Sequence, residues 1–129
     1  MPILFNKVAR GNPQDDKAPK KWYAVLKKIV QVKEKDVARQ IADETTLNRK
    51  EAEMALSQLE KVLITNLLAG NSVQLGDWGS FRLTCNSDPS DTAAEVTASK
   101  IRKLNIRFTP GHSITNSLKG ATFISTDTL

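Results

Sequence analysis

The residues of this chain that could perform acid–base, nucleophilic or metal chemistry are few and scattered. His112 is the one histidine, and it directly follows Pro110-Gly111 with no partner group evident for general base catalysis. Cys85, the one cysteine, has the parity of a core-facing strand residue, so we interpret it as a small buried apolar residue rather than a nucleophile. The adjacent acids Asp15-Asp16 and Asp43-Glu44 are typical of solvated charge. We therefore expect no enzymatic activity.

Binding of metals or cofactors has no sequence signal either. The chain contains no cluster of cysteine and histidine residues and no glycine-rich phosphate loop of the form G-x-x-x-x-G-K-[ST]. A single cysteine excludes an internal disulfide and fits a reducing compartment. The sequence has no run of about 18 apolar residues, and its start has no signal-peptide pattern. We expect a cytoplasmic protein without cofactor, metal, small-molecule substrate or membrane span.

The positive charge of the chain is concentrated at its two ends. The formal net charge is +5 over 129 residues. Residues 1–30 carry a net charge of +5 and residues 100–129 a net charge of +4, whereas residues 31–69 and 70–99 carry −1 and −3. A basic chain favours a polyanionic partner such as nucleic acid, although many soluble proteins are equally basic.

The middle of the chain is organised by two helical patterns. Residues 33–44 carry apolar residues on one face, and a second helix is expected from Asn48 to about residue 69. Glu51 lies three residues after Asn48, which matches a capping box, and Gly70-Asn71 supplies the stop. The apolar stripe of the second helix is too wide for the first helix to cover, which favours a homodimer.

Strand patterns flank the helices on both sides. Residues 3–10 and 22–27 predict an N-terminal hairpin with a long polar connection. After the helices we expect strands at 73–75, 80–86 and 95–109, then a short helix at 112–119 and a polar tail at 120–129 anchored by Phe123 and Ile124. Lys20 and Lys21 precede Trp22-Tyr23, which indicates either solvated lysines at a strand edge or an aromatic and basic patch for nucleic acid.

Strand alternation separates apolar residues from cations after the helices. If Phe81 and Leu83 face the core, their neighbours face away from it, and the same holds around Ile106 and Phe108. The residues that this parity turns outward are Arg82, Thr84, Lys103, Asn105 and Arg107. Cations on one sheet face either contact phosphates, without reading sequence, or form an ordinary solvated surface.

Three motifs in this order give the chain a family resemblance. They are Asn48-Arg49-Lys50-Glu51-Ala52 at the start of the second helix, Gly76-Asp77-Trp78-Gly79-Ser80-Phe81 at a tight turn, and Arg107-Phe108-Thr109-Pro110-Gly111. Together they resemble the bacterial HU/IHF histone-like DNA-binding family over residues 32–119. Residues 1–31 resemble the N-terminal extension of a longer HU-related subfamily.

The resemblance implies an α+β fold and an intertwined homodimer. Each chain would place a helix pair over a three-stranded antiparallel sheet with an extended β arm at about residues 84–104, and would add an N-terminal β hairpin. In the family, the two arms embrace double-stranded DNA in the minor groove. The resemblance therefore implies a histone-like nucleoid protein that binds DNA with little sequence specificity.

The arm tip departs from the family pattern. Ser87-Asp88-Pro89-Ser90-Asp91 keeps a proline but flanks it with acids, where typical members have arginine and lysine. We therefore interpret Pro89 as a turn residue rather than a wedge between bases. An HU-fold structural or protein-interaction module with weak or no DNA binding is the alternative hypothesis. The candidate DNA contacts are Arg82, Lys103, Arg107, Asn105, Lys100, Arg102, Lys20 and Lys21.

Overall fold

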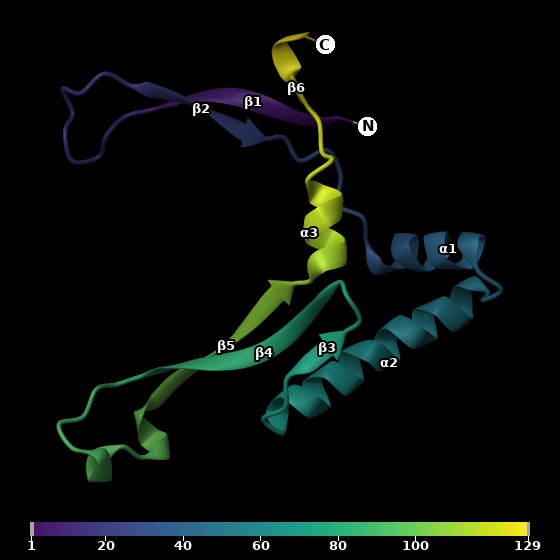
Figure 1. Ribbon diagram of the computed structural model, residues 1–129, viewed down its shortest axis with the longest axis vertical. Coiled ribbons are helices and arrows are strands. Elements are labelled where there is room, and N and C mark those ends of the chain that lie inside the picture. Colours follow the sequence, from purple (N-terminus) through teal and green to yellow (C-terminus); the bar gives the residue numbers. More distant parts are fainter. Residues whose placement is uncertain (1, 129) are drawn as a thin grey trace. The chain divides into compact units, whose positions relative to one another are not determined.

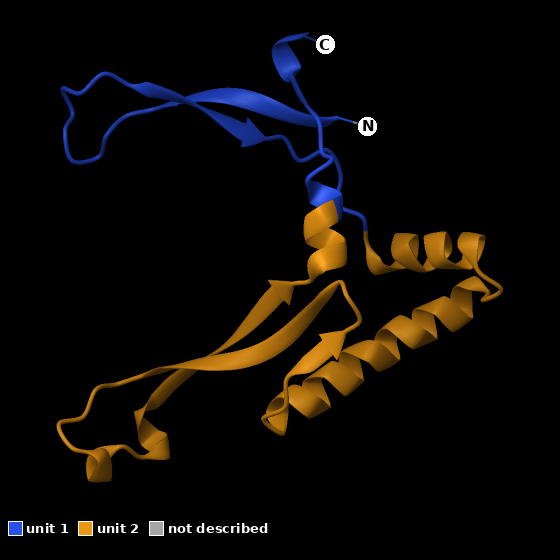
Figure 2. Cartoon of the chain, viewed as in Figure 1, with its two compact units in different colours: residues 1–32, 117–129 blue, residues 33–116 orange. Residues whose placement is uncertain are grey.

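The computed structural model describes residues 2–128, which fall into two compact units. The arm unit comprises residues 33–116, and the hairpin unit joins residues 1–32 to residues 117–129 (Figure 2). The described residues form three α helices and two sheets of three strands each. The predicted α+β class is confirmed.

Two helices open the arm unit, and their ends follow the sequence signals. They are α1 (Glu34–Glu44) and α2 (Arg49–Leu68) (Figure 1). Asn48 Oδ1 accepts a hydrogen bond from the Glu51 backbone N–H at 2.8 Å, and the Asn48 N–H donates to Glu51 Oε1 at 3.4 Å. This reciprocal pair satisfies two backbone donors at the helix start. Gly70, with φ of 87°, follows the helix end, so the predicted capping box and stop are confirmed.

The helices lead into an antiparallel sheet with the strand order β3-β4-β5. The strands are β3 (Val73–Leu75), β4 (Gly79–Ser87) and β5 (Ile101–Pro110). Gly76, with φ of 58°, turns the chain between β3 and β4, a conformation that glycine adopts without strain. Gly79 is buried, and a Cβ atom there would collide with the ring of Phe108. Both glycines of the predicted tight connection therefore have a steric role.

An aromatic cluster packs beside this turn. The ring of Trp78 lies 6.1 Å from that of Phe81 in an edge-to-face arrangement and 6.0 Å from that of Phe108. The centroids of Phe81 and Phe108 are 5.0 Å apart. These spacings are those of favourable aromatic pairs. The cluster joins the turn to both long strands, although Trp78 itself remains 42% exposed.

The Trp78→Ala variant should lose about 2 kcal/mol of unfolding free energy. This is less than the roughly 3–5 kcal/mol typical of a fully buried tryptophan, because part of the side chain already contacts solvent. Urea unfolding at a fixed protein concentration measures the loss. Trp78→Phe, which keeps a ring in the cluster, should lose less. An alanine variant of unchanged stability but weaker DNA binding would contradict the structural role.

Apolar burial within the described chain is sparse. Among residues 2–128, Ala38, Ala52 and Leu67 are the buried apolar side chains. Ile64 and Leu68, which belong to the predicted wide stripe of α2, remain exposed. The helices and sheet of one chain therefore leave much of this stripe uncovered.

The long strands continue past β3 as a two-stranded arm. Between them, residues 93–95 and 98–100 form short 3₁₀ turns, in which Lys100 N donates to Thr97 O at 2.9 Å. These local hydrogen bonds replace the strand ladder, so β5 begins at Ile101 rather than at the expected residue 95. Pairing shifts register between Asn86 and Ser87, and this shift leaves Arg102 as the extra residue of a bulge.

Cys85 differs from its prediction. It lies opposite Leu104, on the same side of the arm as the apolar pairs, so its predicted parity is correct. The side chain is nevertheless exposed, since the sheet has narrowed there to two strands: β3 pairs only as far as Phe81. The predicted burial of Cys85 is wrong for the described chain.

The hairpin unit forms a second sheet with the strand order β2-β1-β6. Its strands are β1 (Ile3–Arg10), β2 (Lys21–Leu26) and β6 (Phe123–Ser125). The predicted N-terminal hairpin is present. The C-terminal segment, which the sequence presents as a polar tail, instead adds β6 parallel to β1, with Phe123 opposite Ile3 and Ile124 opposite Leu4.

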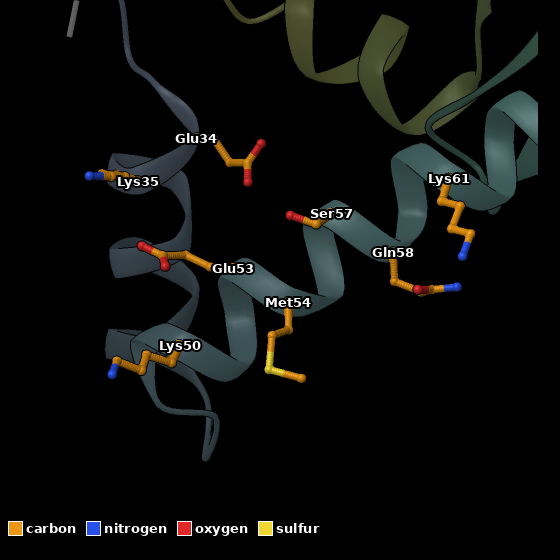
Figure 3. A pocket seen from close by; sticks show the side chains of 8 residues that line it. All are labelled: Glu34, Lys35, Lys50, Glu53, Met54, Ser57, Gln58 and Lys61. Carbon is orange, nitrogen blue, oxygen red and sulfur yellow. The ribbon is translucent and has the colours of Figure 1, made fainter.

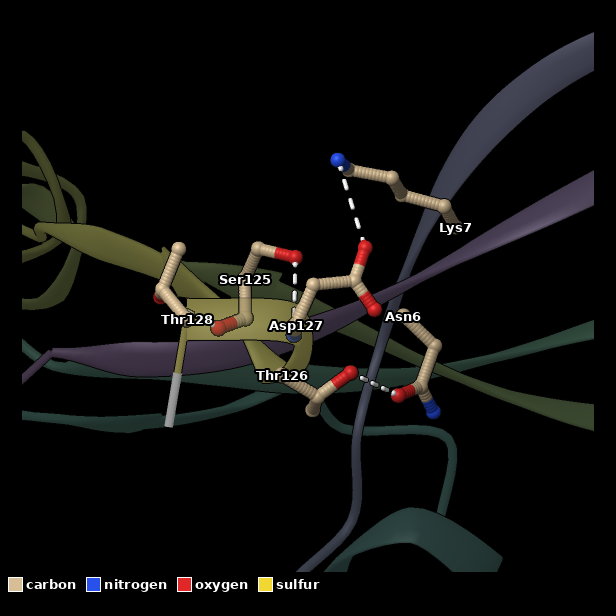
Figure 4. A network of polar contacts seen from close by, with 6 residues as sticks. All are labelled: Asn6, Lys7, Ser125, Thr126, Asp127 and Thr128. Carbon is tan, nitrogen blue, oxygen red and sulfur yellow. Dashed lines mark hydrogen bonds and ion pairs between the residues drawn. The ribbon is translucent and has the colours of Figure 1, made fainter.

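Polar contacts hold the C-terminal segment to β1 (Figure 4). Thr126 Oγ1 donates to Asn6 Oδ1 at 2.9 Å, and Lys7 Nζ lies 3.3 Å from Asp127 Oδ2. Ser125 Oγ accepts a hydrogen bond from the Asp127 N–H at 3.2 Å, which orders the final turn. The two ends of the chain thus share one structural unit.

Candidate nucleic-acid interface

The register of β4 and β5 gathers four of the proposed DNA contacts on one sheet face. Arg82 pairs with Arg107, and Asn86 pairs with Lys103. Asn105 lies between them in β5, opposite Thr84. Paired residues of an antiparallel ladder point to the same side, and alternate pairs share that side. We call these six residues the basic strand face: Arg82, Thr84, Asn86, Lys103, Asn105 and Arg107.

The opposite face of the same strands is apolar. There Phe81 pairs with Phe108, and Leu83 pairs with Ile106. The parity argument from the sequence therefore assigns the correct residues to each face. The aromatic cluster fixes the two strands from the apolar side, and this packing holds the cations on the other side at a defined spacing.

The cations of the basic strand face have no acidic partner within the described chain. The ion pairs found among residues 2–128 involve none of Arg82, Lys103 and Arg107. All three side chains are exposed. Arg82 and Arg107 occupy directly opposite positions, where like charges repel each other. A bound polyanion would relieve this repulsion.

Asn86 is a face residue that parity along β5 alone does not reveal. Asn105 Nδ2 donates to Asn86 Oδ1 at 3.1 Å, which links the two strands beside Lys103. Amide side chains commonly donate to phosphate and sugar oxygens, so Asn86 belongs with the candidate contacts. Strand alternation along β4, from Arg82 through Thr84 to Asn86, is the sequence signal that could have identified it.

One candidate cation of the arm tip, Arg102, forms an ion pair within the tip. Arg102 Nε lies 2.5 Å from Asp88 Oδ2, and the Asp88 N–H donates to the Lys100 carbonyl at 2.9 Å. The charge of Arg102 is therefore matched by Asp88 at the bulge. Asp91 is exposed, and Pro89 lies in the irregular segment between β4 and the first 3₁₀ turn. The tip presents neither a cluster of free cations nor a rigid hairpin around its proline.

Lys20 and Lys21 belong to the hairpin unit rather than to the arm unit. Lys20 precedes β2, and Lys21 is its first residue, opposite Arg10 of β1. Arg10 is a further basic residue beside these two lysines that no sequence motif marks. Its position opposite Lys21 follows from strand register, and an apolar or charge pattern could not reveal it.

The arm unit also has a broad hollow along its helices, with a volume of about 700 Å³ (Figure 3). The charged residues that line it are Glu34, Lys35, Lys50, Glu53 and Lys61. Figure 3 shows that these side chains spread outward in different directions instead of converging on one point. Such a surface lacks the mutual geometry of a catalytic site. His112 lies apart from it in sequence, at the first residue of α3 (His112–Leu118).

Residues 2–128 offer neither a metal site nor a membrane span. No group of three or more histidine, cysteine, aspartate or glutamate side chains there could hold a metal ion. None of the described helices is long and apolar enough to cross a membrane.

A helix pair, a three-stranded sheet and a two-stranded arm with one cationic face define an HU-type domain, and comparison with known proteins agrees. Residues 1–125 match the family HU-HIG, described as an HU domain fused to wHTH, Ig, or glycine-rich motif. The chain belongs to this family. HU-type domains are in general non-enzymatic DNA-binding domains.

One similar solved structure is that of a bacterial protein proposed to bind DNA, from Bacteroides vulgatus ATCC 8482. The TM-score is 0.67 at 12% sequence identity, which shows a shared fold. The match covers 96% of this chain and 48% of that protein, so the chain spans about half of its length. No curated protein matches the sequence.

Proposed function

We propose that this chain is a homodimeric, non-catalytic nucleoid protein of the cytoplasm that binds double-stranded DNA with little sequence specificity. The observation that supports this function most strongly is the basic strand face, where Arg82, Lys103 and Arg107 lie on one side of β4 and β5 without an ion pair among residues 2–128. Contacts from such residues to phosphates position a protein on DNA without reading bases. Membership of an HU-type family supports the same function.

The homodimer is supported by an uncovered apolar groove. A hollow of about 310 Å³ lies between α2 and the strands. Apolar side chains that line it are Leu56, Leu59, Leu63, Ile64, Leu67, Phe81 and Ile106. A groove of this composition next to so small a buried core requires cover in water. A second copy of the chain, which offers the same apolar surface, is the occupant we propose.

The proposed DNA complex needs no proline wedge. Asp88 is engaged by Arg102, and the acids around Pro89 repel phosphates. The arms would therefore follow the duplex through the basic strand face, and strong kinking at the tip is not expected. Gel shifts with random duplex at low and moderate salt test binding, and circularisation of short duplexes tests bending.

Reversing the charge of the arm tip should strengthen binding. Asp88→Lys combined with Asp91→Lys removes two repulsive carboxylates, releases Arg102 and adds two cations to each arm. We expect an affinity gain of about tenfold or more near 100 mM salt, together with a steeper salt dependence. Fluorescence anisotropy with a labelled random duplex measures both.

The matched control applies the same change of charge to the helices, with Glu34→Lys and Glu53→Lys. Its gain should be clearly smaller if the arms contact DNA. Equal gains in both variants would show that the arm tip does not approach the duplex. Lack of duplex binding by the parent chain would instead favour the protein-interaction module.

A further inference from the structure

The loop end of the N-terminal hairpin carries an unusual pair of charges. Arg10 of β1 and Lys21 of β2 are directly opposite each other. The guanidinium carbon of Arg10 lies 5.8 Å from the centroid of the Tyr23 ring. Like charges at opposite positions destabilise a ladder, and the cation–π contact places the Arg10 head at the Tyr23 ring, two residues along β2 from Lys21.

No carboxylate of the described chain neutralises this pair. The ion pairs among residues 2–128 include none of Arg10, Lys20 and Lys21. The connecting loop holds two acids, Asp15 and Asp16, but residues 10–21 keep a net charge of +2. Asp15 Oδ1 accepts a hydrogen bond from the Lys17 N–H at 3.0 Å, within its own turn. The end of the hairpin therefore presents positive charge without an internal partner.

The same residues border a hollow in the hairpin unit of about 390 Å³. Its lining includes Arg10, Lys21, Tyr23, Asn12, Pro13 and Pro19. The loop that closes it is ordered by successive turns, in which Asn12 Oδ1 accepts from the Gln14 N–H at 2.9 Å and the Asn12 carbonyl accepts from the Asp15 N–H at 3.1 Å. Prolines restrict the loop further. The hollow is thus preformed rather than assembled on binding.

The ribbon that carries this hollow is narrow. β6 pairs with only Ile3–Phe5, so β1 and β2 form a two-stranded ribbon from Asn6 to Arg10. Lysines at a strand edge can serve merely to prevent aggregation. That role explains Lys20 and Lys21, but it requires neither an arginine held over a tyrosine ring nor a hollow that both Arg10 and Lys21 line.

We infer that the loop end of the N-terminal hairpin is a second DNA-contacting site, in which Arg10 and Lys21 bind the phosphates of duplex DNA. Tyr23 positions the guanidinium, and Lys20, the residue before Lys21, adds charge nearby in sequence. This inference rests on the proposed function, since it assigns the same partner to a separate part of the chain. Two cations per chain extend the phosphate contacts beyond those of the basic strand face.

The first test is the salt dependence of binding to a random duplex. Arg10→Ala combined with Lys21→Ala should reduce the slope of log affinity against log salt by about 2 per bound chain. Lys27→Ala combined with Lys28→Ala removes the same charge from the hairpin unit, beyond the end of β2, and should change the slope less. Equal changes in the two variants would overturn the inference, because they would reflect net charge alone.

The second test reports on the hairpin directly. The chain has one tyrosine, so fluorotyrosine labelling gives a single ¹⁹F signal, from Tyr23. Addition of random duplex should shift this signal in the parent. In the Arg82→Ala/Arg107→Ala variant, the duplex should also shift the Tyr23 signal, provided that the DNA is saturating and the salt concentration is low.

These outcomes separate the two proposals. Suppose that the parent binds DNA in a gel shift but the Tyr23 signal does not move. The proposal of a hairpin site is then refuted, and the proposal that the basic strand face contacts DNA is retained. Suppose instead that the Tyr23 signal shifts, while Arg82→Ala with Arg107→Ala leaves the affinity for DNA unchanged. The proposal that the basic strand face contacts DNA is then refuted, and the proposal of a hairpin site is retained. If the parent binds no duplex in either assay, both proposals fail.

Discussion

Arg82→Ala combined with Arg107→Ala should weaken binding to random duplex DNA more than any other pair of substitutions on the sheet. The two residues form one cross-strand pair, so a dimer loses four cations from its basic strand face. Each phosphate contact contributes about 0.9 to the slope of log affinity against log salt. We therefore expect the slope to fall by about 3.6, with an affinity loss of at least a hundredfold near 50 mM salt.

A matched control distinguishes contact from net charge. Lys35→Ala with Lys50→Ala removes the same charge from the helices and should leave the slope nearly unchanged. Arg82→Lys with Arg107→Lys keeps the charge and should retain most of the slope, although it loses the bidentate contacts that arginine makes to phosphate. If the alanine pair binds like the parent, the basic strand face does not contact DNA.

Ile64→Asp should separate the proposed dimer. Ile64 is 50% exposed in one chain, so a carboxylate at this position can remain hydrated in a monomer. In a dimer that covers the groove it would be an unpaired buried charge, which costs roughly 3 kcal/mol or more. The dissociation constant should therefore rise more than a hundredfold.

Sedimentation at micromolar concentration measures this change. The parent should have about twice the chain mass of 14.2 kDa, and the variant should have the mass of one chain or lose its fold. Met54→Asp is the control, because Met54 is 70% exposed on the same helix and lines the charged hollow instead of the apolar groove. A folded monomeric parent would contradict the dimer.

Local signals predicted much of the arm unit. Asn48 and Glu51 fix the start of α2 through contacts three residues apart, and Gly76 fixes a turn by its backbone conformation. Strand alternation also turned Arg82 and Arg107 away from the apolar side, since each lies between apolar neighbours in its own strand. Each of these features depends on residues close together in sequence.

Features set by long-range register were not predictable in the same way. The Asp88–Arg102 ion pair depends on a bulge at Arg102, and no local sequence pattern predicts this bulge. The strand β6 is three residues long and pairs with β1 from the other end of the chain. The position of Arg10 opposite Lys21 in the strand ladder likewise depends on the length of the loop between β1 and β2. Cys85 had the right parity, but its exposure depends on where the third strand ends.

The salt dependence of duplex binding by the parent chain tests the central claim most directly. Affinity for two unrelated random duplexes, measured between about 50 and 200 mM salt, should be nearly equal at each concentration. Six cations of the basic strand face in a dimer give a slope of about −5, and the hairpin cations extend it toward about −9. Absence of binding near 50 mM salt, or strong preference for one duplex with a slope near zero, would contradict a phosphate-binding nucleoid protein.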